Sequence, residues 1–243
     1  QQHMEMNNLH PHLKLEGATP RLIDEWQEAP RLWDAIRHEV DRRGQDGQFI
    51  LTGSAAPSGD KIGQIHHSGT GRFAWLRMRP MSLWESRESN GRVSFAELFA
   101  GHTDIAEQAP NHMLDDIAYL MCRGGWPGTL RKKTQKAALM VATEYLKAVT
   151  NTDIVKVDGV QRNPERVRRL MRSLARHQGT SVSLNTLAQD LSSIEATTLS
   201  ENTIKDYIAA LKKIFVVEDT LAWNPNLRSK TAIRSTDTHY FVD

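Results

Sequence analysis

Two short apolar runs that end in polar residues flank one amphipathic helix, and this pattern constrains the fold more than any other feature of the sequence. The first run is RLIDEW at residues 21–26, and the second is QFILTGS at residues 48–54. Between them, Pro30 precedes a predicted helix at residues 31–43 whose apolar residues recur at helical spacing. Two buried strands joined by a helix form a βαβ unit with parallel strands. The sequence therefore predicts an α/β fold here.

A candidate site is built from the residues at which the two apolar runs stop. Asp24 and Glu25 close the first run, and Ser54 closes the second. A helical crossover brings the carboxyl ends of parallel strands together, so we expect the acids and the hydroxyl to be neighbours. One carboxylate could then hold Mg²⁺ while the other polarises a water molecule. A solvated turn is the alternative interpretation of the same residues.

In the middle of the chain, the sequence predicts a further strand and then helices. FAWLRMRPMSLWE at residues 73–85 is interpreted as a strand followed by a turn, and residues 93–120 carry a weak helical pattern. RGGWPG at residues 123–128 is a turn cluster that ends the helix before it. A long helix follows, and its apolar stripe comprises Leu139, Ala142, Leu146 and Val149.

The last third predicts three helices and a hairpin. PERVRRLMRSLARH at residues 164–177 is a basic helix, and Ser183 and Ser200 cap two further helices. Two strands follow in FVVEDT and THYFVD, at either side of a polar loop. Elements in this order outline a winged helix-turn-helix.

Composition excludes several classes of protein. With 39% hydrophobic residues in 243, the chain is not disordered as a whole, and the single Cys122 excludes a disulfide scaffold and fits a reducing cytosol. No run of about 18 apolar residues occurs, and the polar N-terminus lacks the apolar stretch of a signal peptide. We therefore expect a cytoplasmic protein with no membrane partner.

Charge is distributed unevenly along the chain. Residues 1–120 contain 12 basic and 17 acidic residues, whereas residues 121–243 contain 19 basic and 12 acidic ones. In the basic helix, Arg168, Arg172 and Arg176 recur at i, i+4 and share one face. A DNA or protein partner is therefore expected for the winged helix, and a solvated helix face is the alternative interpretation.

The sequence gives little support for a zinc site or for a serine hydrolase. Ten histidines are present, but Cys122 has no partner at the spacing of zinc ligands. Ser54 is not the nucleophile of a serine hydrolase elbow, because Ala56 stands where that turn needs glycine.

The sequence resembles a family of prokaryotic AAA+-like P-loop ATPases in which an ATPase core precedes a C-terminal domain of unknown function. The resemblance covers nearly all of residues 13–243. It is carried by LIDEWQEAPRLWDAIRHEVDRR, FILTGSAAP, HHSGTGRFAWLRMRPMSLWES, RGGWPG and HYFVD.

This resemblance implies ATP and Mg²⁺ as cofactors of the parent protein and gives roles to four residues. Asp24 would be the Walker B magnesium residue, Glu25 the catalytic glutamate and Ser54 a sensor-type residue. Arg72, in TGRF, would be an arginine finger or sensor, and a finger acting across a subunit boundary would require a homo-oligomer.

The predicted fold class is then a partial P-loop-type parallel sheet followed by a mainly helical domain with the winged helix. The predicted divisions are a truncated ATPase core at residues 1–90, a helical connection at 91–160 and the winged helix at 161–243.

One departure from the family pattern concerns the phosphate-binding loop, in which a glycine precedes a lysine. None of the 15 glycines of this chain is followed by lysine. Two interpretations remain open: a fragment of a longer ATPase, or a natural short protein that has lost hydrolysis. In either case we expect these residues to bind neither ATP nor Mg²⁺ usefully. The alternative function is a non-enzymatic nucleic-acid- or protein-binding module on a degenerate ATPase scaffold.

Overall fold

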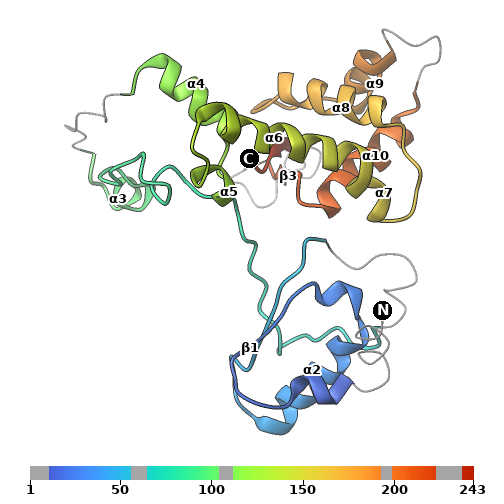
Figure 1. Ribbon diagram of the computed structural model, residues 1–243. Helices are drawn as coiled ribbons and strands as arrows, with labels where there is room; N and C mark the ends of the chain where they lie inside the picture. The colour runs from blue at the N-terminus through green and yellow to red at the C-terminus, as the bar shows by residue number, and fades with distance from the viewer. Residues whose placement is uncertain (1–10, 56–64, 104–111, 193–198, 223–236) are drawn as a thin grey trace. The chain divides into compact units, whose positions relative to one another are not determined.

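A computed structural model describes residues 11–55, 65–103, 112–192, 199–222 and 237–243 (Figure 1). These residues form two compact units. The first comprises the described residues up to Arg77 together with Asp153–Phe241, and the second comprises Met78–Thr152 together with Val242 and Asp243. The fold is mixed α/β, with one small parallel sheet and a mainly helical remainder.

The predicted βαβ unit is confirmed in the first unit. Strand β1 (Arg21–Ile23) pairs in parallel with β2 (Phe49–Leu51), and helix α2 (Arg31–Arg43) connects them. In this register Ile23 lies opposite Leu51. Two short 3₁₀ helices flank the first strand: η1 (Pro11–Leu15) precedes it and η2 (Trp26–Glu28) follows it.

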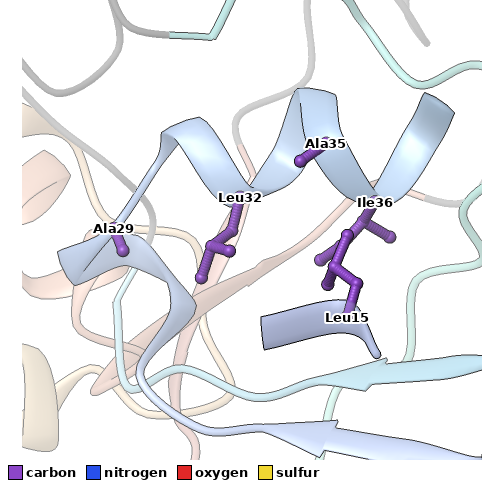
Figure 2. Packing of buried hydrophobic residues seen from close by; sticks show 5 residues of the cluster. All are labelled: Leu15, Ala29, Leu32, Ala35 and Ile36. Carbon is purple, nitrogen blue, oxygen red and sulfur yellow. The ribbon is translucent and has the colours of Figure 1, made fainter. Parts of the chain in front are cut away.

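One face of the strand pair packs against α2. The side chain of Ile36 points from α2 towards Leu15 of η1, and Leu32 points from α2 to the same side of the helix (Figure 2); Ile36 is 1% exposed. Alternate strand residues face opposite sides of a sheet, and the side chains of the central pair, Leu22 and Ile50, are exposed. The sheet therefore has one covered and one bare face within the described residues.

Charged side chains fix η1 against the last turns of α2. The Arg43 guanidinium donates a 2.7 Å hydrogen bond to the backbone carbonyl of Leu15. Glu39 holds that arginine through a 2.6 Å hydrogen bond from Arg43 Nε and accepts two more from Arg42. These hydrogen bonds lower the pKa of Glu39 to about 2, so its carboxylate is ionised at every ordinary pH.

The prediction of a strand within residues 73–85 is wrong. Residues 73–82 have no regular structure, and a turn follows at 83–87. The side chains of Trp75 and Leu76 are exposed, at 78% and 94%. A strand needs a neighbour for its backbone hydrogen bonds, and no other described strand pairs with this segment.

The second unit is helical. Its elements are α3 (Phe95–Phe99), α4 (Leu114–Arg123), α5 (Pro127–Leu130) and α6 (Gln135–Ala148). The predicted break after α4 is confirmed, because Gly124 has a φ of 70°. Gly125 joins distant segments there: its N–H donates to Asp243 at 2.8 Å, and its carbonyl accepts from the Met81 N–H at 2.8 Å.

The long predicted helix ends in a π-helical turn, η4 (Val149–Asp153), and a single further turn, α7 (Ile154–Lys156). Val149 is buried as the stripe predicts, but Leu146 is 37% exposed. The predicted weak helix at residues 93–120 is resolved into α3 and α4, and residues 104–111 between them lie outside the described part.

The last elements confirm the predicted three helices and hairpin. Helices α8 (Pro164–Arg176), α9 (Leu184–Ser192) and α10 (Glu201–Lys213) precede antiparallel strands β3 (Val217–Thr220) and β4 (Thr238–Phe241). The hydroxyls of Ser183 and Ser200 accept the N-terminal hydrogen bonds that their predicted capping roles require. Most of the loop between the strands, residues 223–236, lies outside the described residues. The winged-helix type and the three predicted divisions of the chain stay predictions.

No helix in the described ranges is long and apolar enough to cross a membrane.

Glu39 generates a prediction about acid stability. Because its pKa is lowered from 4.5 to about 2, its contribution is fully present above pH 4.5 and is lost as the pH falls towards 2. The urea midpoint of wild type should therefore exceed that of Glu39→Gln at pH 7, and the difference should shrink through pH 4 and pH 3. A difference that stays constant down to pH 2.5 would contradict the assigned hydrogen bonds.

Candidate active site

The candidate site lies where the parallel ladder continues beyond the two strands. After β1 and β2 end, the Thr52 N–H still donates to the Ile23 carbonyl at 2.9 Å, and the Trp26 N–H donates to the Thr52 carbonyl at 3.1 Å. These two backbone bonds hold the turn containing Asp24 and Glu25 beside the turn containing Thr52 and Ser54. The predicted proximity of the two strand ends is therefore observed.

Each carboxylate accepts a hydrogen bond from a hydroxyl of the neighbouring turn. Thr52 Oγ1 donates to Asp24 Oδ1 at 2.6 Å, and Ser54 Oγ donates to Glu25 Oε2 at 3.2 Å. All four side chains belong to residues that are at least partly exposed. The two acids are thus oriented separately, one by each hydroxyl, and both remain open to solvent.

Glu25 has an unusual backbone that a buried amide supports. Its φ of 52° and ψ of 43° lie in the left-handed region, which costs a non-glycine residue about 1–2 kcal/mol. Gln27, only 6% exposed, donates from its side-chain amide to Glu25 Oε2. Strained residues that their surroundings hold in place cluster at functional sites, so this turn is a candidate for function.

Gly53 makes room for that amide. A Cβ atom at Gly53 would lie 2.2 Å from Gln27 Oε1, which is far inside van der Waals contact. Gln27 Oε1 is buried and has no hydrogen-bond partner within the described residues. The absence of a side chain at Gly53 therefore allows the two turns to pack closely.

A pocket of about 450 Å³ opens beside the acidic turn. Its charged lining comprises Lys14, Arg21, Asp24, Glu25 and Glu28. The Arg21 guanidinium is already bound to the backbone carbonyls of residues 14 and 16. Among the described residues, three carboxylates therefore share the pocket with one lysine and this engaged arginine, so its negative charges outnumber its positive charges, which disfavours a polyphosphate.

Arg72 is not among the groups that contact the two acids. Its guanidinium binds Asp41, with Nε at 2.9 Å from Oδ1, and donates to the Thr70 carbonyl at 3.1 Å. The hydrogen bond from Arg72 lowers the pKa of Asp41, and the same contact raises the pKa of Arg72. Asp41 lies ten residues beyond Arg31 in α2, about 15 Å along the helix axis. The predicted role of Arg72 stays a prediction.

Two residues of the site were not singled out from the sequence. Thr52 comes directly after β2, as Asp24 comes directly after β1, so the strand register makes them partners. In this register Ile23 pairs with Leu51. The two apolar runs alone do not predict which residues pair. Gln27 carries no comparable signal, because its contact depends on the left-handed turn at Glu25.

The donor set fits a magnesium ion that is shared with a phosphate ligand. Mg²⁺ binds through one or two carboxylates, substrate phosphates and several waters rather than through an all-protein cage. Asp24 is an exposed carboxylate of this kind, held in orientation by Thr52. Among the described residues, no group of three or more His, Cys, Asp or Glu side chains could hold a metal ion.

Comparison with known proteins gives a family match for the N-terminal part. The model of an AAA domain matches residues 3–86, which include the parallel strands and both turns of the site. This match supports an AAA-like ATPase.

The chain belongs to the family of the domain of unknown function DUF8612, whose model matches residues 114–243, more than half of the chain. It is also similar to two relatives that are themselves uncharacterized, protein Mb2031c of Mycobacterium bovis and protein Rv2008c of Mycobacterium tuberculosis. Each is 24% identical over 218 residues, which cover 89% of this chain and 42% of the relative. The chain thus spans about two fifths of the length of these relatives.

The hydrogen bond between Thr52 and Asp24 can be measured directly. We expect the double-mutant cycle of Thr52→Val and Asp24→Asn to give a coupling free energy of about 1 kcal/mol, because the bond is charge-assisted but partly exposed. Urea denaturation of the four proteins measures it. The cycle of Thr52→Val with Asp46→Asn is the matched control and should show no coupling. Equal coupling in both cycles would contradict the contact.

Proposed function

We propose that the full-length protein hydrolyses ATP with Mg²⁺ at this site and that the chain supplies its acidic part. The observation that supports the proposal most directly is the arrangement of two adjacent carboxylates, each oriented by a hydroxyl of the neighbouring parallel strand end. In α/β proteins, nucleotides bind at the edge formed by the carboxyl ends of the parallel strands. These acids and hydroxyls lie at that edge. The AAA match over the same residues agrees with it.

Asp24 is the proposed Walker B residue, which holds Mg²⁺ through a water molecule. When bound, Mg²⁺ neutralises charge on the phosphate oxygens during transfer. The hydrogen bond from Thr52 leaves Asp24 Oδ2 as the oxygen directed to such a water. Thr52 is therefore a positioning residue, because it acts through Asp24.

Glu25 is the proposed catalytic glutamate, which orients the attacking water and accepts its proton. Both Gln27 and Ser54 donate to Glu25 Oε2, so Oε1 is the oxygen that remains for the water. Ser54 is the proposed sensor: its hydroxyl lies at the junction of the two turns and can exchange its partner when a phosphate is present.

Arg72 is proposed as an arginine finger that acts across a subunit boundary of a homo-oligomer. Within one chain it is held by Asp41 near the end of α2, so a role in transition-state charge stabilisation requires a neighbouring copy.

The phosphate cradle is the part that this chain does not provide. Triphosphate affinity comes largely from loop amides, a lysine and Mg²⁺, and the chain has no glycine followed by lysine. Its pocket presents three carboxylates against one lysine and one arginine. The alternative, a non-enzymatic nucleic-acid- or protein-binding module on a degenerate ATPase scaffold, rests on this same absence.

The C-terminal elements complete the proposal. Helices α8, α9 and α10 followed by the β3–β4 hairpin support a winged-helix assignment, through which a cytoplasmic ATPase could contact DNA or a protein.

Nucleotide binding by the 243 residues alone should be negligible. Isothermal titration calorimetry with MgATP should show no binding in the micromolar range, because the pocket disfavours the polyphosphate that no loop cradles. Micromolar binding would contradict this part of the proposal without contradicting the roles of the two acids.

Full-length Glu25→Gln should bind ATP as wild type does and lose turnover by a factor of about 10² or more, because the amide cannot accept the proton of the water. Binding and steady-state hydrolysis are measured on the same preparation. Asp46→Asn, an exposed acid in the loop before β2, removes the same charge and should leave turnover unchanged. Undiminished turnover in Glu25→Gln would remove Glu25 from the mechanism.

A further inference from the structure

Helix α8 has two faces of opposite character. Its inner face is closed by Val167, Leu170 and Leu174, which are 0–3% exposed. The opposite face presents Arg168, Arg172 and Arg176, all of which are exposed. Successive arginines are four residues apart, so they form a row on one face that extends about 12 Å along the helix axis.

The helix that carries this arginine row is fixed at its start and along its inner side. Asn163 caps α8 by accepting from the N–H groups of Glu165 and Arg166, and Ser173 donates to Asp190 of α9 at 2.5 Å. A helix that is capped at its start and packed along one side fixes the positions of the charges that it displays.

Nearby acids neutralise only part of the row. Asp190 lies 4.0 Å from Arg176, and the Arg176 side chain is still 75% exposed. Glu165 pairs with Arg169 at 3.5 Å, beside the row. Within the described residues neither Arg168 nor Arg172 forms an ion pair. Like charges at i, i+4 destabilise a helix, so the row carries a cost that an anionic partner would offset.

The chemistry of the face favours a nucleic acid over a protein. A protein interface has an apolar centre, whereas the exposed residues beside this row are Glu165 and Ala175, and Arg169 and Met171 are partly exposed, so charged residues predominate on this face. Protein–DNA interfaces are more polar and more positive. Each strand of a duplex carries about one phosphate per 3.4 Å of the axis, so a row of about 12 Å can reach about three phosphates.

We propose that Arg168, Arg172 and Arg176 bind the phosphate backbone of a nucleic-acid duplex. The contact reads no sequence, since it reaches phosphates and not base edges. The proposal does not depend on ATP hydrolysis, because none of the three arginines lines the pocket beside Asp24 and Glu25.

The test is a fluorescence-anisotropy titration of the 243-residue protein with labelled 20-base-pair duplexes, one of DNA and one of RNA, from 50 to 300 mM KCl. The logarithm of the association constant should fall linearly with the logarithm of the salt concentration, by about 0.9 per phosphate contact. The triple variant R168Q/R172Q/R176Q should lower the magnitude of that slope by about 2.7, and each single variant by about 0.9. The tighter duplex identifies the partner as DNA or RNA.

The matched control is the triple variant K132Q/K133Q/K136Q, which removes the same charge from exposed residues just before α6 and in its first turn and should keep the wild-type slope. The melting temperature of the arginine variant should equal or exceed that of wild type, because the like-charge contacts are gone. Failure of wild type to bind either duplex, an unchanged slope in the arginine variant, or equal losses in both triple variants would overturn the proposal. If the triple variant does not fold, the single variants R168Q and R172Q are compared with wild type instead. An unchanged salt slope in both would overturn the proposal.

Discussion

The parallel pairing of β1 with β2 is the constraint on which the rest of the candidate site depends. Each strand is only three residues long, so the turns after the strands fix the register as much as the strands themselves. The two backbone bonds that Thr52 makes with Ile23 and Trp26 extend the ladder into these turns. Because the turns carry the acids and hydroxyls, one register brings both carboxylate–hydroxyl pairs together. A slip by one residue would separate Asp24 from Thr52 and turn the apolar side chains away from α2.

The turn at Glu25 shows how local strain and burial combine at this edge of the sheet. A left-handed glutamate is unfavourable alone, but the buried amide of Gln27 and the missing side chain of Gly53 let the chain keep it. At the C-terminal end of α2, Glu39 and Arg43 fix η1, whose Leu13 and Lys14 line the pocket. Thus packing and charge position the rim of the pocket, while the acidic turn itself stays open to solvent.

The sequence predicts the strand–helix–strand unit and the nearness of Ser54 to Glu25, because a helical crossover leaves parallel strand ends little freedom. It does not predict Thr52 or Gln27, since their contacts depend on register and on one backbone angle. The strand expected within residues 73–85 failed for a different reason: its apolar pattern is present, but no described strand offers it backbone partners. The pairing of Arg72 with Asp41 joins residues 31 positions apart and depends on tertiary placement that no local pattern encodes.

Metal-directed cleavage of the full-length protein would test the central claim, that Asp24 and its neighbouring turn surround a nucleotide-bound metal. Fe²⁺ replaces Mg²⁺ with ATP present, and peroxide then cuts the backbone near the ion. The account predicts ATP-dependent cuts at residues 23–26 and 52–54, both lost in Asp24→Asn. Cuts confined to other parts of the chain, or cuts at these turns that persist without ATP, would contradict it.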